Sequence, residues 1–504
     1  MDKWPQELYD HVVSFVERVW HPTLPSAYPA IAAVSRKFQA AIERRSFHHL
    51  HIYTTKERLD RFKSILTPRR RNILRILTVS IILPSYPAKS FFKFETDEDR
   101  RANNKAATAA MGRLFRILAG NDSQYDESMT PVLDLKIRGI YSPSDQLSVE
   151  REPHRERYAF SLLDLTSEVS KFPPLPRVRS FCICRTTKRA WNPRVAMSLT
   201  AKMVKATHVE WRFPCMRGYQ EKWNAYPSLD RMFRDDLVDS IKSAELPASV
   251  TTFSCDLISP ATKRYHALPR FVAPGEYDPV SCALRRLTRN CTDIFIDGPM
   301  HLSLFDPPAG VLSTSQPCWQ DTTRLQVRVD MQAPDGSWLF QLENGVSTPN
   351  RPGSPTDLDR PPPGYWTTEE EREEAEEYYA EHLGNAISPP PGLDRKDPKD
   401  ADMNALLAAF ARACFHMPAL QLAVLDACND NDDGLPFRVS CVAPGNPYGS
   451  LDKKYANGSD SWRVYLHVDE WRPTEATMEE FKRIGRARNG ENPKVCFLPW
   501  GIYD

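Results

Sequence analysis

A unit of one helical segment followed by one short strand recurs along most of this 504-residue chain. The helical segments place apolar residues at steps of three and four, and the segments after them alternate apolar with polar residues. Residues 106–119, for example, precede an alternation at Leu133, Leu135 and Ile137. The other predicted pairs are 195–205 with 208–213, 229–243 with 250–255, 282–289 with 293–296 and 403–417 with 420–425, and further strands are expected at 178–183, 325–329 and 462–468.

None of these units can bury its apolar face alone, so they must pack against one another. Stacking in chain order predicts an irregular, leucine-rich-repeat-like α/β array. The periodic signature L-x-x-L-x-L-x-x-N is missing from every unit, so a compact α/β domain with a mostly parallel sheet is the alternative. The predicted fold class is α+β or α/β, with a small N-terminal helical module before the array.

The N-terminal residues 4–50 carry two amphipathic helical stripes. Pro5 suits the first turn of a helix, where its missing N–H is not needed. The first stripe is Leu8, Val12, Phe15, Val16 and Val19, and the second, after a break at 21–26, is Ile31, Val34, Phe38 and Ile42. Such a short segment has too few large side chains for a stable core, so we expect its apolar residues to face the rest of the chain or a partner.

Three short strings in this region identify a family resemblance. WPQEL at 4–8, VVSFV at 12–16 and VSRKF at 34–38 resemble the LPxEL start, aliphatic first helix and V-C/S-R-x-W turn of an F-box. The string 34–50, with RRRNILRIL and the turn at Leu83–Tyr86, further resembles F-box-like proteins of filamentous fungi. The resemblance implies a three-helix fold that inserts apolar residues into a Skp-family adaptor of a cullin-RING (SCF) ubiquitin ligase. The adaptor-binding residues that it implies are Pro5, Leu8, Val12, Phe15, Val16, Ile31, Val34 and Phe38. The alternative for this region is a helical cap packed on the remaining chain.

Composition shifts divide the chain further. We expect an F-box-like module at 1–50, α/β array at 51–345, an insertion at 346–400 and the rest of the array at 401–504. The insertion combines proline runs with an acidic segment through Glu381, where Thr368 and Glu371 form a capping box. It therefore predicts a mobile linker with one solvated helix.

Bulk charge and cysteine usage exclude several function classes. Lys plus Arg number 66 and Asp plus Glu 65, so no net charge draws the chain to nucleic acid or an anionic membrane. The most apolar run, 73–83, contains Arg75 and is much shorter than the roughly 20 residues that cross a bilayer. Eleven cysteines without C-x-x-C spacing or a signal peptide indicate a reducing compartment, cytoplasmic or nuclear, in which all of them are reduced.

The sequence shows no catalytic motif and no expected cofactor or metal site. His48, His49 and His51 have no cysteine nearby, and adjacent residues point to different sides of a helix or strand. Cys182 and Cys184 are expected on one side of a strand as small buried hydrophobic residues. The favoured function is therefore a non-catalytic substrate receptor that binds a Skp-family adaptor, through it a cullin, and an unknown protein substrate. The alternatives are an adaptor-binding scaffold without a role in ubiquitin transfer and an enzyme whose site residues are dispersed in sequence.

Overall fold

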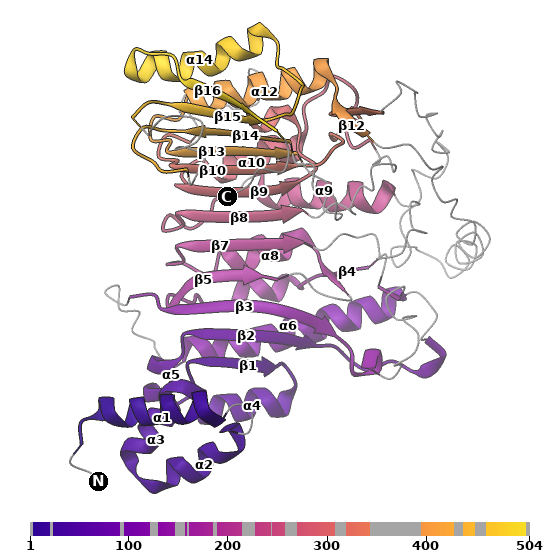
Figure 1. Ribbon diagram of the computed structural model, residues 1–504. Helices are drawn as coiled ribbons and strands as arrows, with labels where there is room; N and C mark the ends of the chain where they lie inside the picture. The colour runs from indigo at the N-terminus through magenta and orange to yellow at the C-terminus, as the bar shows by residue number, and fades with distance from the viewer. Residues whose placement is uncertain are drawn as a thin grey trace.

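A computed structural model of the protein places a three-helix module at one end of a large sheet (Figure 1). The module comprises α1 (Gln6–Trp20), α2 (Leu24–Val34) and α3 (Arg36–Ser46). The structure describes residues 4–20, 24–90, 95–120, 130–146, 157–158, 161–184, 189–213, 227–242, 244–257, 270–307, 319–342, 395–427, 437–448 and 460–499.

The sheet has twelve strands whose order in space follows their order in the chain. They are β1 (His49–Tyr53), β2 (Ile76–Ile82), β3 (Leu133–Tyr141), β5 (Val178–Ile183), β7 (His208–Phe213), β8 (Thr252–Leu257), β9 (Asp293–Gly298), β10 (Arg324–Val329), β13 (Leu422–Ala427), β14 (Phe437–Val442), β15 (Arg463–His467) and β16 (Lys494–Leu498). Neighbours are parallel except β14, which runs antiparallel to both β13 and β15. The fold is thus mixed α/β with a mostly parallel sheet.

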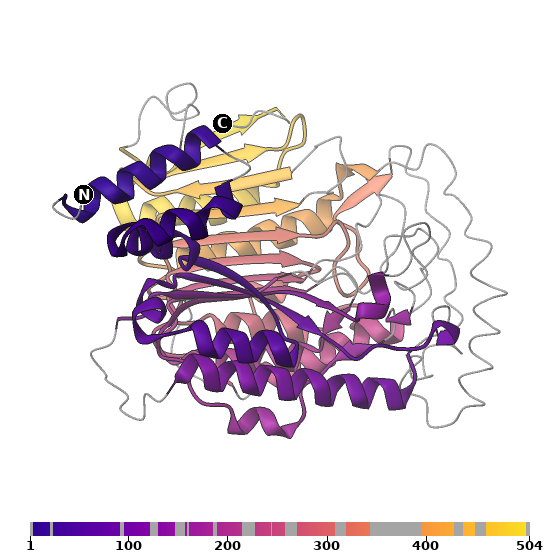
Figure 2. The same cartoon turned by 90° about the horizontal axis from the view of Figure 1, so that it is seen from below.

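Helices pack on one side of this sheet, which we call the helix face (Figures 1 and 2). They are α4 (Lys56–Ile65), α5 (Pro68–Ile73), α6 (Asp97–Ala119), α8 (Pro193–Thr200), α9 (Pro227–Ile241), α10 (Pro279–Leu287), α12 (Asp400–Phe415) and α14 (Glu475–Asn489). Short 3₁₀ turns η1 (Ala88–Ser90), η2 (Pro143–Gln146), η3 (Ser167–Lys171) and η4 (Leu302–Leu304) and the small strand pairs β4 (Leu162–Leu163) with β6 (Ala190–Trp191) and β11 (Phe340–Leu342) with β12 (Arg395–Pro398) complete the described elements.

The core lies between the sheet and these helices because alternate strand residues point to the same side. One row of the register runs through Leu77, Leu135, Phe181, Val209 and Phe253, each of which is fully buried. The helices contribute the other half of the same apolar cluster. The alternation that predicted the strands therefore also decides which side of the sheet carries helices.

The opposite side, which we call the polar face, carries the remaining strand residues. A row of charged side chains crosses β7 to β14 in register: Arg212, Asp256, Asp297, Arg328, Asp426 and Arg438. Arg328 pairs with Asp297 at 3.2 Å, and Arg438 bonds Asp426 through Nε at 2.5 Å and Nη2 at 3.1 Å. Neighbouring charges have opposite sign except at Asp256 and Asp297, which lie directly opposite each other, and the three arginines and three aspartates of the row leave it without net charge.

Most predicted elements lie where the pattern placed them. The helix-then-strand pairs are confirmed, and the apolar run 73–83 contains strand β2, directly after the basic helix α5. The prediction missed β1, β14 and β16 of the large sheet, the four strands of the two small pairs, and helices α4 and α14. In β1 the sequence His49–Tyr53 puts His49, His51 and Tyr53 on the exposed side, which hid the strand among polar residues.

The predicted insertion falls mostly outside the described residues. Residues 343–394, with the capping box and acidic segment expected there, are not among them. The described chain on either side is held together, because β11 pairs antiparallel with β12. Among the described residues, no helix combines the length and apolar character that a membrane span requires.

Candidate functional site

The N-terminal module has a small apolar core made by α1 and α3. Tyr9 and Val13 of α1 are buried against Ala41 and Ile42 of α3. The ring of Phe38 meets that of Tyr9 edge-on, with centroids 4.8 Å apart. The inner side of α1 is therefore Tyr9 with Val13, four residues apart, and the sequence analysis missed Tyr9.

Polar contacts fix the orientation of α1 on α3. Asp10 pairs with Arg44, and Arg45 donates from Nη2 to Ser14 Oγ at 2.7 Å. Near the start of α1, Gln6 donates from Nε2 to the carbonyl of Lys37 at 3.0 Å. These contacts hold α1 against α3 along its inner side, so its outer side has a defined direction.

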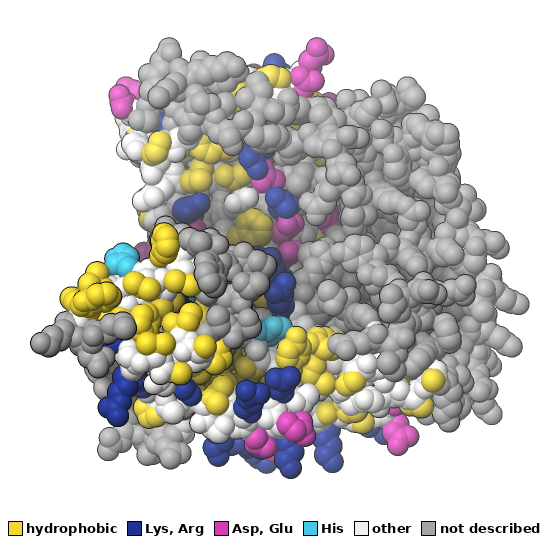
Figure 3. Space-filling view, turned by 60° about the horizontal axis from the view of Figure 1, so that its bottom comes forward, with side chains coloured by type: hydrophobic (Ala, Val, Ile, Leu, Met, Phe, Trp, Pro, Cys, Tyr) yellow, Lys and Arg dark blue, Asp and Glu magenta, His cyan; other side chains and the backbone are white. Residues whose placement is uncertain are grey.

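The outer side of α1 is an apolar stripe that the described chain leaves exposed. Leu8 is 44% exposed, Val12 39% and Phe15 66%. Their spacing of four and three residues places them on one side of the helix. Figure 3 shows hydrophobic side chains gathered on this module. We call Leu8, Val12 and Phe15 the α1 stripe; an exposed apolar cluster of this kind marks an interaction surface.

The eight residues that the family resemblance implied divide into two groups. Pro5, the α1 stripe and Val34, which is 60% exposed at the end of α2, face outward. Ile31 and Phe38 are half-buried and pack on the module core, and Val16 is half-buried as well. Phe38 lies one turn before Ile42 on the inner side of α3. Its ring packs against Tyr9, on the inner side of the helix that carries the stripe.

A buried ion pair connects the module to the sheet. Glu43 of α3 is 7% exposed and accepts hydrogen bonds from Arg70 of α5, from Nη2 at 2.7 Å and from Nε at 3.3 Å. Arg70 also lies over the ring of Phe47, 4.5 Å from its centroid. Burial opposes the charge on Glu43, but the hydrogen bond and charge of Arg70 outweigh burial, so its pKa is lowered. The contact anchors α3 directly beside β1, the edge strand.

Comparisons with protein-family models, with curated proteins and with solved structures find no match for this chain. Among the described residues, no group of three or more His, Cys, Asp or Glu side chains is arranged to bind a metal. His49 and His51 instead hydrogen-bond Thr78 Oγ1 at 3.2 Å and Ser80 Oγ at 2.8 Å on the neighbouring strand. Because no comparison identifies a relative, we interpret the α1 stripe from its residues, their exposure and their contacts.

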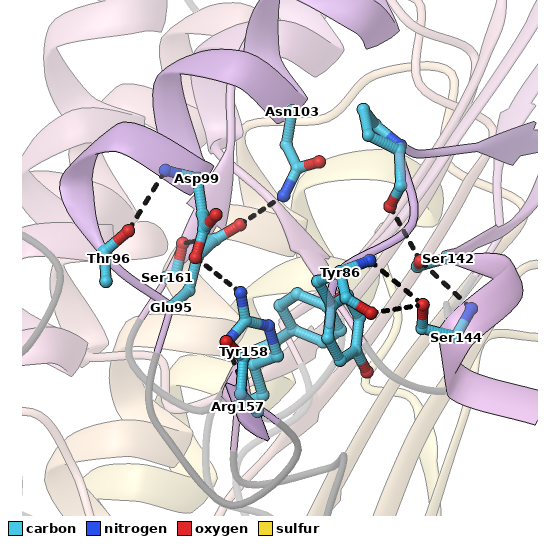
Figure 4. Close-up of polar contacts among 12 residues, drawn as sticks. Tyr86, Glu95, Thr96, Asp99, Asn103, Ser142, Ser144, Arg157, Tyr158 and Ser161 are labelled. Carbon is cyan, nitrogen blue, oxygen red and sulfur yellow. Dashed lines mark hydrogen bonds and ion pairs between the residues drawn. The ribbon is translucent and has the colours of Figure 1, made fainter. Parts of the chain in front are cut away.

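A second cluster of polar residues lies around the start of α6 (Figure 4). Glu95 and Arg189 form a bidentate pair at 2.6 and 2.7 Å, and both side chains are completely buried. Asn103 and Ser161 donate to the same carboxylate, one to each oxygen. Because both oxygens of Glu95 are satisfied by protein donors, this carboxylate holds segments together rather than meeting a substrate.

Two tyrosines extend this cluster toward the loop after β3. Tyr86 donates to Asp145 Oδ1 at 2.5 Å, and the guanidinium of Arg157 lies 4.3 Å from the centre of the Tyr86 ring. Burial raises the pKa of both Tyr86 and Tyr158 far above that of a free phenol. Both phenols are therefore neutral hydrogen-bond donors at any physiological pH. We interpret the whole cluster as structural, because its contacts join the loops after β2 and β3 to the start of α6.

Proposed function

We propose that this protein is a non-catalytic substrate-recognition subunit of an SCF-type ubiquitin ligase. In this proposal the N-terminal module binds a Skp-family adaptor, and through it a cullin, while the sheet holds a protein target. The exposed α1 stripe carries the proposal, because it faces outward on a helix whose inner side packs on α3. Burying a large apolar side chain contributes about 1.5–3 kcal/mol, and such anchors cluster at interfaces.

In this proposal the residues of the module have two different roles in adaptor binding. Leu8, Val12, Phe15 and Val34 contact the adaptor directly, and Pro5 starts the helix that presents three of them. Ile31 and Phe38 contribute indirectly, by packing on the module core. Val16, half-buried on α1, lies at the border between the two groups.

The sheet supports the second half of the proposal as a repeat-like array. Strands in chain order with helices on one side are the arrangement of solenoid proteins, whose other surface is extended and available for a partner. The charged row across β7 to β14 gives that surface mixed charge, which selects partners by electrostatic complementarity. We place the target on the polar face and on the loops at the strand ends, where binding residues concentrate.

Co-purification of the full chain with a recombinant Skp-family adaptor tests the module. The double variant Leu8→Ala/Phe15→Ala is expected to weaken binding by about 100-fold or more, because each truncation removes about 1.5 kcal/mol or more of apolar burial. Both side chains are exposed, so the circular dichroism of the protein should not change. The matched control is Val204→Ala/Tyr277→Ala, which removes two apolar side chains exposed by 37% and 44% elsewhere. Full adaptor binding by the Leu8/Phe15 variant would contradict the proposal.

A second measurement separates a ligase subunit from a scaffold. We expect the Leu8→Ala/Phe15→Ala variant, expressed in place of the native protein, to raise the steady-state level of proteins that co-purify with the full chain. Adaptor binding by the native chain without any such accumulation would favour the scaffold. Absence of adaptor binding together with turnover of a small molecule would favour a dispersed enzyme site.

A further inference from the structure

A pair of cysteine thiols lies in contact on the polar face at the end of β5. The Sγ atoms of Cys182 and Cys184 are 3.3 Å apart. Cys182 is 4% exposed, whereas Cys184 follows the last residue of the strand and is half-buried. The expectation that both thiols face one side of the strand is therefore confirmed. The expectation that both are small buried hydrophobic residues is wrong for Cys184, which is only half-buried.

Charged groups on both neighbouring strands face this pair. In register, Lys136 of β3 and Glu210 of β7 lie on either side of Cys182, and Arg212 is the next polar-face residue of β7. The hydrogen bond from Cys182 lowers the pKa of Cys184; burial and Glu210 oppose this shift, while Arg212 and Lys136 favour it. The same contact, together with burial, raises the pKa of Cys182. Cys184 is thus the more readily ionised thiol, and once it is ionised the S–H of Cys182 can donate to its thiolate.

The Cα separation at this position lies inside the range that a disulfide spans. Two residues on the same side of a strand have Cα atoms about 6.6 Å apart, and disulfides bridge about 4.4–6.8 Å. A disulfide also brings its Cβ atoms to about 3.5–4.5 Å, which is closer than parallel side chains on one side of a strand, so forming the S–S bond bends the end of β5 as well as rotating the side chains. The spacing is near the upper limit, which is typical of disulfides that are easily reduced again.

We propose that Cys182 and Cys184 are a reversible redox modification site, at which hydrogen peroxide converts the two thiols to an intramolecular disulfide. The site lies on the polar face, away from the α1 stripe, and the proposal does not depend on adaptor binding. A cytosolic disulfide of this kind is characteristically transient and redox-sensing.

The reaction balances with peroxide as the oxidant. The thiolate of Cys184 attacks one peroxide oxygen, the O–O bond breaks, and Cys184 becomes a sulfenic acid while the other oxygen leaves as water after protonation. Cys182 then attacks the sulfenic sulfur, forms the S–S bond and releases the second oxygen as water. Two thiols are oxidised by two electrons, and one hydrogen peroxide is reduced to two waters.

A second pair of neighbouring cysteines serves as an internal control. Cys414 of α12 and Cys441 of β14 also lie within hydrogen-bonding reach of each other, but both are completely buried in the core. Burial raises the pKa of Cys414 well above that of a free thiol. Both pairs therefore bring two sulfur atoms close together. Among these four cysteines, only Cys184 combines partial exposure with a lowered thiol pKa.

Peptide mass spectrometry of the peroxide-treated full chain tests the proposal. Trypsin cuts after Arg179 and Arg185, so Cys182 and Cys184 fall in one peptide. We expect this peptide to become lighter by two hydrogen atoms in the native protein and to regain them with dithiothreitol, while Cys414 and Cys441 stay reduced. If both thiols of the peptide survive peroxide that oxidises free glutathione in the same tube, the proposal is wrong.

Two variants separate this site from the general tendency of nearby cysteines to oxidise. In Cys182→Ala, dimedone should trap a sulfenic acid on Cys184, and alkylation of Cys184 at pH 7 should slow by about tenfold because the thiolate loses its hydrogen-bond donor. In Cys184→Ser, Cys182 should resist both peroxide and alkylation. Unchanged alkylation of Cys184 in the first variant, with an unchanged melting temperature, would overturn the proposed role of Cys182.

Discussion

The N-terminal module and the sheet differ in what their apolar side chains touch. The sheet buries most of its apolar residues in one core that runs from β1 to β16, with a second small cluster at Val442, Tyr465 and Leu498. The module has a separate core of four buried residues and leaves the α1 stripe outside it. The module therefore has little buried apolar surface of its own, whereas the sheet is stabilised by an extensive core.

The two regions also use ion pairs differently. In the sheet region, Arg189 and Glu95 are completely buried, so each depends on the other for its charge. In the module, Arg44 and Asp10 are 51% and 31% exposed, and water can replace either partner. Removing one member of a buried pair leaves an unpaired charge in the core, which is the more damaging change.

The largest expected effect follows from this contrast. Arg189→Met should lower the free energy of unfolding by about 3–5 kcal/mol, because Glu95 remains buried without its partner. Arg44→Met, the matched change in the module, should cost less than about 1 kcal/mol. Urea denaturation followed by circular dichroism measures both, and equal effects would mean that the two pairs are equally solvated.

A smaller, local effect is expected inside the module. Tyr9→Ala removes the fully buried ring that contacts Phe38, and should destabilise the module by about 2–4 kcal/mol. Because the module core is separate, hydrogen exchange should accelerate in α1 and α3 and remain slow in β2 to β10. The control is Phe15→Ala on the same helix, which is 66% exposed and should change neither. Loss of protection throughout the sheet would show that the regions fold as one unit.

The smallest effect concerns the pH dependence of the junction. The pKa of Glu43 is lowered from 4.5, so its ion pair with Arg70 stabilises the protein above about pH 4.5, and this contribution is lost as the pH falls through the lower folded-state value. Hydrogen exchange of α3 at a series of pH values should therefore show declining protection in the acid range. Glu43→Gln should flatten that decline, whereas Glu479→Gln, in the exposed pair with Lys482 on α14, should leave it unchanged.

Much of the sheet could be predicted because its strands obey a short-range rule. Residues that alternate between buried and polar, such as those of β7 and β8, show their side chain direction in the sequence itself. Strand β14 was missed although its sequence alternates, with Phe437, Val439 and Cys441 separated by Arg438 and Ser440. The structure buries all but one of its residues, because an apolar cluster with Tyr465 and Leu498 covers its polar-face side as well.

The sequence revealed only part of the candidate site. Helical spacing identified Leu8, Val12 and Phe15 as one apolar side of α1, but the same spacing also fits Tyr9 with Val13. A helix with two apolar sides does not reveal which one faces inward. The position of α3, fixed by Phe38 and by the arginines that bond α1, decides that Tyr9 is buried and Phe15 is exposed.

Local pattern was thus enough for the helix-then-strand unit, for most element positions and for the helical nature of the N-terminal segment, because these depend on residues a few positions apart. Packing between distant segments decided the rest. It set the order of the strands, which side of α1 faces inward, and the charged surroundings of Cys184. It also brought together the Glu95–Arg189 ion pair, whose residues are 94 positions apart. Such contacts depend on which segments meet in space, and a linear sequence does not contain that information in any local window.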